Sequence, residues 1–161
     1  MIIWIEKALV LAIHDRQIAE HGGSAELRDD GLLESALARP LQLQAYGDPR
    51  PDLADLAAAL ASGLARNHPF VDGNKRTAHV AYRTFLVLNG MELVSTDEEK
   101  YVSMLALAEG KLAEGDFAAW LRAHLQLARR NEAHEPRPMY RAKAARVGAR
   151  TRTAARARSA R

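Results

Sequence analysis

A regular repeat of apolar residues over positions 53–64 constrains the fold of this chain more than any other feature. The repeat falls at i, i+3, i+4, i+7 and i+11 and consists of Leu53, Leu56, Ala57, Leu60 and Leu64. This spacing predicts a helix with one apolar face, and Asp52 is positioned to cap it. A second apolar stripe consists of Ala78, Ala81, Tyr82 and Phe85 and precedes the stop signal Asn89-Gly90. The two helices therefore form a hairpin, with the polar stretch that begins at His68 at its bend.

The other patterns in the first 128 residues also favour helices, so we expect an all-α bundle. Further helices are predicted over 6–20, closed by Gly22-Gly23, over 32–38, ended by Pro40, after a capping box at 96–99, and after a cap at Asp116. Residues 41–51 are predicted to be a loop or hairpin. A short strand is predicted at Met91–Val94, with residues 2–4 as its partner.

The charge of the chain is divided unevenly. Residues 129–161 contain 11 Lys/Arg and 2 Asp/Glu, a local charge of +9, whereas the whole chain carries +3. Residues 1–128 therefore carry −6. We interpret residues 1–128 as a catalytic domain and residues 129–161 as a disordered or conditionally helical basic tail, because the tail has no apolar period. Nucleic acid is a partner only through this tail, and a solvated, low-complexity extension is the preferred explanation of the tail.

Two absences bear on the location of the protein. The sequence contains no cysteine, which excludes disulfide and thiol chemistry. The apolar run Leu9–Ile13 is far too short to span a bilayer, and no basic-then-apolar leader is present. We therefore expect a cytoplasmic protein with no membrane partner.

The stretch HPFVDGNKR, residues 68–76, combines a base, a carboxylate and an anion site. Lys75 and Arg76 fall in the first turn of the second helix, where the macrodipole disfavours cations unless an anion such as phosphate is bound there. His68 is the candidate general base, and Asp72 is the candidate ligand for Mg²⁺. This combination indicates phosphoryl or nucleotidyl transfer.

The other candidates for phosphate or nucleotide binding are Arg66, Gly73 and Asn74. Gly73 permits close approach of its backbone to a phosphate, and Asn74 either caps the helix, orients the loop or contacts the nucleotide. Arg66, two residues before the base, is expected to point toward the same site. Each residue also has a structural explanation: a histidine that ends a helix, an Asx-turn at Asp72-Gly73, or a solvated helix face.

The same stretch resembles the signature loop of the Fic/Doc superfamily, His-x-Phe-x-(Asp/Glu)-Gly-Asn-x-Arg. Residues 21–23 and 28–40 also resemble its death-on-curing branch, and the resemblance covers residues 1–128. It implies a helical Fic fold with the loop between two core helices, and transfer of the γ-phosphate of ATP to a protein hydroxyl. In that branch the target is a threonine of elongation factor Tu, and translation stops. Lys75 stands where AMP-transferring members have glycine, and His79 stands where they have a second arginine; Lys75 would hold the nucleotide reversed.

The resemblance also bears on partners. The nearest match to the inhibitory Ser/Thr-x-x-x-Glu-(Gly/Asn) helix of many Fic enzymes is 95–99, but Lys100 follows the glutamate. We therefore expect a toxin that is held by a separate antitoxin, and residues 39–52 are the expected flap for docking a protein target. Two alternatives remain open: a Fic-type AMP transferase, and a non-enzymatic module that binds nucleic acid or an antitoxin.

Overall fold

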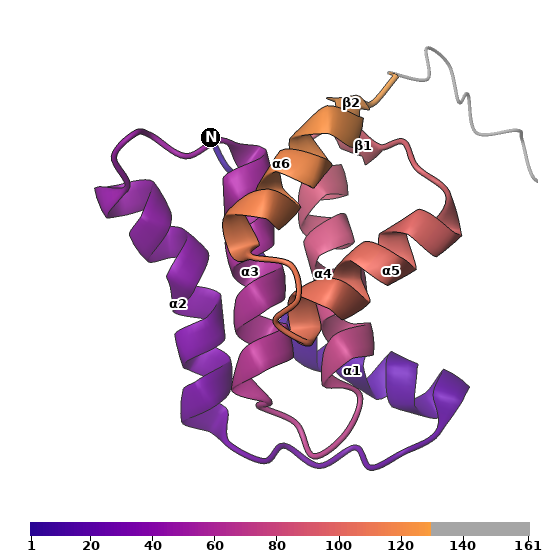
Figure 1. Ribbon diagram of the computed structural model, residues 1–161. Coiled ribbons are helices and arrows are strands. Elements are labelled where there is room, and N and C mark those ends of the chain that lie inside the picture. Colours follow the sequence, from indigo (N-terminus) through magenta and orange to yellow (C-terminus); the bar gives the residue numbers. More distant parts are fainter. Residues whose placement is uncertain (130–161) are drawn as a thin grey trace, which may run out of the picture. The chain divides into compact units, whose positions relative to one another are not determined.

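Helix α3 (Leu53–Asn67) lies at the centre of the fold (Figure 1). The computed structural model describes residues 1–129, and within them α3 packs against α2, α4, α5 and α6. Ala54 and residues 56–65 are all buried, so the prediction of a single apolar face is wrong. The many small alanines let neighbouring helices approach from several sides. At Gly63 the approach of α2 is so close that an added Cβ would lie 3.1 Å from the Ala36 Cα atom.

Helix α4 (Asn74–Leu88) packs against α3, and the two form the predicted hairpin. Its predicted stripe of Ala78, Ala81, Tyr82 and Phe85 is buried. The helix stops at the predicted place: Asn89 is its C-cap, and Gly90 follows with φ of +77°. The short connection between α3 and α4 carries the polar stretch of residues 68–73 at one end of the bundle (Figure 1).

Four outer helices complete the helical part of residues 1–129: α1 (Lys7–His21), α2 (Asp30–Tyr46), α5 (Asp97–Ala108) and α6 (Glu114–His124). Asp52 caps α3 and Thr96 begins a capping box, both as predicted, and Asp52 also forms a capping box with Asp55. The predicted cap of α6 is wrong, because α6 begins at Glu114 with Ala113 as N-cap and already contains Asp116. Every helix within the described residues is too short or too polar to cross a membrane.

Helix α2 differs most from the prediction, because it continues through Pro40 to Tyr46. A proline inside a helix loses one backbone hydrogen bond and crowds the preceding turn. Here the ring of Pro40 is buried, and Leu37 and Leu43 pack against the core on either side of it. The packing of this helix thus outweighs the local cost of the proline. The expected 39–52 loop is therefore reduced to a short connection after Tyr46.

The predicted strand is present as β1 (Met91–Leu93), but its predicted partner is wrong. β1 pairs antiparallel with β2 (Leu125–Leu127), which follows α6 directly. The segment around Ile3 is held instead by the Asn89 side chain, which bonds both the N–H and the C=O of Ile3 at 2.9 Å. The predictions for the basic tail fall, apart from Arg129, outside the described residues.

The ion pair that links α6 to the start of α3 gives the fold a dependence on acid. Arg122 holds the pKa of Asp52 at about 2, mainly through its hydrogen bond to that carboxylate. The folded pKa lies below the unfolded one, so this stabilisation is complete above about pH 4 and is lost as pH falls toward 2. Since both side chains are 49% exposed, the pair contributes about 1 kcal/mol or less.

We therefore expect urea denaturation of Arg122→Gln to show an unfolding free energy lower by about 1 kcal/mol at neutral pH, with this difference vanishing near pH 2. An equal difference at both pH values would contradict the assignment.

Candidate active site

Residues 68–72 are fixed to the chain segment that connects α1 and α2. Arg28 and Asp29 donate their backbone N–H groups to the Pro69 carbonyl at 2.8 and 3.0 Å. Val71 donates to the Glu26 carbonyl at 3.0 Å, and Leu27 and Phe70 form an isolated antiparallel bridge. The polar stretch between α3 and α4 is thus held as part of a small backbone network, which suits residues that must position a reacting group.

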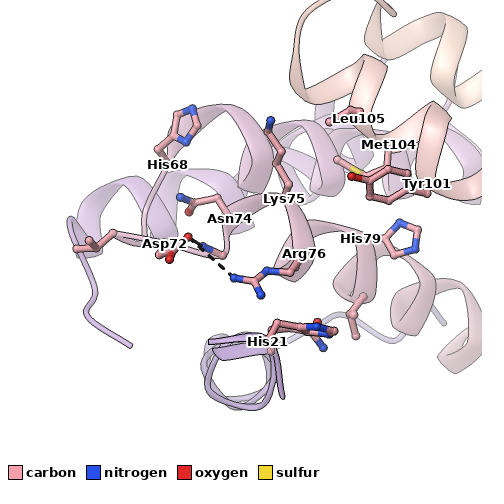
Figure 2. A pocket seen from close by; sticks show the side chains of 14 residues that line it. His21, His68, Asp72, Asn74, Lys75, Arg76, His79, Tyr101, Met104 and Leu105 are labelled. Atoms are coloured by element: carbon pink, nitrogen blue, oxygen red, sulfur yellow. Dashed lines mark hydrogen bonds and ion pairs between the residues drawn. The ribbon is translucent and has the colours of Figure 1, made fainter. Parts of the chain in front are cut away.

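His68 occupies a backbone conformation that is uncommon for a residue with a side chain. It is the C-cap of α3, with φ of 49° and ψ of 56°, in the left-handed region. Arg28 supports this conformation: its guanidinium donates to the His68 carbonyl at 2.6 Å and to the Asn67 carbonyl at 2.9 Å. A cation at this helix end also complements the macrodipole. The imidazole of His68 is left exposed at the edge of a cavity (Figure 2).

His14 supports the loop from below, which the sequence patterns did not indicate. The side chain is 1% exposed, and its ring stacks on Phe70 with centroids 3.7 Å apart. Its Nε2 atom lies 2.8 Å from the Asp72 carbonyl, which only accepts hydrogen bonds, so Nε2 donates. His14 therefore fixes both Phe70 and the backbone of Asp72. The one signal in the sequence was a histidine that directly follows an apolar run.

The prediction that Asn74 caps α4 is wrong, because Gly73 is the N-cap and Asn74 is the first helical residue. The Asn74 side chain instead accepts from the Phe70 N–H at 3.0 Å and donates to the Phe70 carbonyl at 2.9 Å. These two bonds satisfy the buried peptide groups of Phe70. Of the three roles predicted for Asn74, these bonds fit the second one, in which its side chain orients the loop.

The N-terminal end of α4 has the features of an anion site. Its N-cap, Gly73, has φ of +78° and provides no side-chain acceptor, and the first turn contains no acidic residue. The free N–H groups of this turn are accompanied by Lys75 and Arg76. Arg76 donates to the Gly22 carbonyl at 3.2 Å and lies 3.9 Å from the Asp72 carboxylate (Figure 2). Lys75 forms no ion pair with any residue in the part of the chain that the structure describes.

The Asp72 carboxylate lies at the edge of the same cavity. Its Oδ1 atom accepts from the Gly73 N–H at 2.8 Å, one residue on rather than the two of the predicted Asx-turn, and the side chain is 51% exposed. Gly23 approaches the other oxygen so closely that a Cβ there would collide with Oδ2. Among residues 1–129 no three His, Cys, Asp or Glu side chains gather as a metal site. A single carboxylate nevertheless fits Mg²⁺, which is commonly held by one or two carboxylates together with substrate phosphates and water.

One cavity of about 680 Å³ brings most of the predicted site residues together. Its wall includes His68, Asp72, Gly73, Asn74, Lys75 and Arg76. Arg66 is not part of this wall, because its guanidinium donates to the Leu107 and Leu112 carbonyls and supports the end of α5. The structure therefore does not bring Arg66 to the site.

The wall of the cavity opposite the loop is formed by α4 and α5 and includes His79. Burial, together with the smaller effect of the positive charges of Arg83 and Lys100, lowers the pKa of His79 to about 4. The Nε2 atom of His79 lies 3.3 Å from Arg83, which can only donate, so Nε2 accepts. His79 is thus neutral at physiological pH and adds no positive charge to this wall.

A substitution of His14 tests its role beneath the loop. His14→Phe keeps the stacking on Phe70 but removes the donor to the Asp72 carbonyl. We expect the activity of this site to fall by about 10- to 100-fold, because the loop loses its exact placement. Val10→Ala is the matched control: Val10 is fully buried one turn earlier on α1, and its apolar side chain cannot form a hydrogen bond with the loop. Equal losses of activity in both variants would show that stability alone is responsible.

Comparison with known proteins is consistent with this geometry. Residues 4–86 match the Fic/DOC family. The chain is 56% identical over 75 residues to "Toxin Doc" of Mycolicibacterium smegmatis, a match that covers 46% of this chain and 57% of that protein. It is 32% identical over 113 residues to "Protein kinase doc" of Escherichia phage P1, covering 70% of this chain and 88% of that protein. The chain therefore belongs to the Fic/DOC family.

Proposed function

We propose that this protein is an ATP-dependent phosphotransferase that moves the γ-phosphate of ATP to a hydroxyl of a protein target and acts as a toxin. The observation that carries this proposal is the arrangement in one cavity of an exposed imidazole, His68, and an uncapped helix N-terminus with two cations. The printed names of the two relatives, a toxin and a protein kinase, support the same activity.

In the proposed reaction His68 takes the proton of the target hydroxyl as that oxygen attacks the γ-phosphorus. The bond between the γ-phosphorus and the β,γ-bridging oxygen breaks, and ADP leaves. The backbone of Gly73 and the side chains of Lys75 and Arg76 hold the phosphate oxygens, while Asn74 keeps the loop in place. When bound at Asp72, Mg²⁺ would neutralise part of the phosphate charge.

Transfer of AMP is the second candidate reaction on the same fold. AMP-transferring relatives are expected to have glycine at position 75 and arginine at position 79. This chain has Lys75 and a His79 that is neutral because burial lowers its pKa to about 4. His79 therefore cannot replace the missing positive charge, and phosphoryl transfer is the better-supported reaction.

The proposed target is a threonine of elongation factor Tu, and the proposed regulator is a separate antitoxin. The nearest internal candidate for an inhibitory glutamate, Glu99, is held at the start of α5 by Ser95 and by the N–H of Thr96. It does not line the cavity. This placement supports inhibition by another protein. The proposed target, elongation factor Tu, implies that the reaction takes place in the cytoplasm.

A non-enzymatic module remains the alternative, and its nucleic-acid binding would depend on the basic tail.

Cell-free bacterial translation tests the proposed function. The wild-type protein with ATP and Mg²⁺ is expected to stop peptide synthesis, and the His68→Ala variant is expected to leave it unaffected. Addition of a phosphatase-treated, then repurified, elongation factor Tu should restore synthesis for a limited time. Equal inhibition by wild type and His68→Ala would argue for a binding module, and unaffected synthesis with both would remove the toxin assignment.

A further inference from the structure

The two ends of the main cavity differ in chemistry. The loop end carries the imidazole, the carboxylate and the two cations described above. The opposite end is lined by Tyr101, Met104 and Leu105 of α5 (Figure 2), and Val80 of α4, the residue after His79, also lines the cavity. His79, the polar group beside them, is uncharged because burial lowers its pKa to about 4. One cavity thus passes from a cationic wall to an apolar and aromatic wall.

A nucleoside triphosphate likewise has one charged end and one uncharged, aromatic end. Its negative charge lies entirely on the phosphates, and its base is a neutral, planar ring with apolar faces. Charge complementarity places the phosphates at Lys75 and Arg76, next to His68. The base then falls at the neutral end, where apolar side chains and an aromatic ring replace the cations.

Tyr101 is the residue at that end best suited to contact a base. The side chain is 61% exposed although it lines the cavity, so its ring is not used for packing in the core. Exposed aromatic rings beside a phosphate site commonly serve as platforms on which bases stack. Met104, which is 2% exposed, forms the adjoining wall with a polarisable sulfur that suits an aromatic ligand.

We propose that the wall formed by Tyr101, Met104 and Val80 is the subsite for the nucleobase of the co-substrate. This proposal rests on the proposed function, because it takes ATP as the co-substrate. It adds a specific contact surface on α5, outside the loop.

Calorimetric titration with two ligands separates the subsite from the phosphate site. The ligands are the β,γ-imido analogue of ATP and inorganic tripolyphosphate, each with Mg²⁺. Tyr101→Ala is expected to weaken binding of the nucleotide by about 5- to 100-fold and to leave tripolyphosphate unchanged. Tyr101→Phe should restore nucleotide binding because it keeps the ring. Val102→Ala, the neighbouring exposed residue on α5 that does not line the cavity, should bind both ligands normally.

Photolabelling with 8-azido-ATP gives an independent readout, because the reactive nitrogen is on the base. Trypsin should release residues 101–111, which contain Tyr101 and Met104, and residues 77–83, which contain His79 and Val80. Label on either peptide that excess ATP prevents supports the subsite. Label confined to residues 67–75, which contain His68, would place the base at the loop and overturn it.

The outcomes also distinguish this proposal from the proposed function. If Tyr101→Ala binds the nucleotide normally while Arg76→Ala weakens both ligands, the subsite is wrong and the phosphate site stands. The subsite is equally wrong if Tyr101→Ala weakens both ligands to the same extent. If the wild-type protein binds neither ligand, the proposed ATP-dependent function fails, and the subsite fails with it.

Discussion

Replacement of His68 by alanine is expected to lower phosphoryl transfer by about 10²- to 10⁴-fold, the range typical for loss of a general base. The imidazole is exposed at the edge of the cavity and is not part of the buried core. Its removal should therefore leave the packing of the core unchanged. Growth arrest on expression should disappear with the activity. The measurement is the initial rate of transfer at saturating ATP, together with urea denaturation of the same preparation.

The backbone conformation of His68 calls for a second variant. Alanine is disfavoured at φ of 49°, at a cost of about 1–2 kcal/mol, whereas asparagine tolerates the left-handed region better. His68→Asn should therefore retain more stability than His68→Ala and should be as inactive, because its amide cannot accept the proton. A His68→Asn protein with near-normal activity would remove His68 as the base.

Replacement of Asn74 by alanine is expected to produce the largest loss of stability among the loop substitutions. Asn74 is 9% exposed and bonds both the N–H and the C=O of Phe70. Each buried polar group left without a partner costs roughly 1–3 kcal/mol, so the unfolding free energy should fall by about 3 kcal/mol. Transfer should also fall sharply, because residues 68–72 lose their anchor to α4.

Asn67→Ala is the matched control for this substitution. Its side chain makes one hydrogen bond, from Nδ2 to the Leu32 carbonyl at 3.0 Å, and it lies just before the loop. We expect a loss near 1 kcal/mol and little change in activity. If Asn74→Ala were as stable as Asn67→Ala, the pair of bonds to Phe70 would not be what fixes the loop.

The parts of the structure that depend on local chemistry could be predicted from the sequence. Asp52 and Thr96 each precede a residue that completes a capping box three positions later, and both boxes form. The helical hairpin and its loop follow from apolar spacing within single segments. The residues from Gly73 to Arg76 lie together for the same reason: they are adjacent in the chain, at the start of one helix.

The predictions that failed concern features that depend on contacts between segments distant in the sequence. The continuation of α2 through Pro40 depends on how that helix packs against the core, which no local rule for proline contains. The partner of β1 is set by where α6 ends. The role of His14 arises because α1 passes beneath a loop some 58 residues later in the chain. The prediction for Arg66 failed for the same reason, because the Leu107 carbonyl in α5 binds its guanidinium away from the site.

The central claim is that the cavity delivers the terminal phosphate of ATP to a protein hydroxyl next to His68. The most direct test incubates the protein with purified elongation factor Tu and Mg²⁺, using ATP labelled either at the γ-phosphate or at the α-phosphate. We expect label on elongation factor Tu from γ-labelled ATP alone, and none with His68→Ala. Label from α-labelled ATP would show transfer of AMP and would rule out transfer of the terminal phosphate.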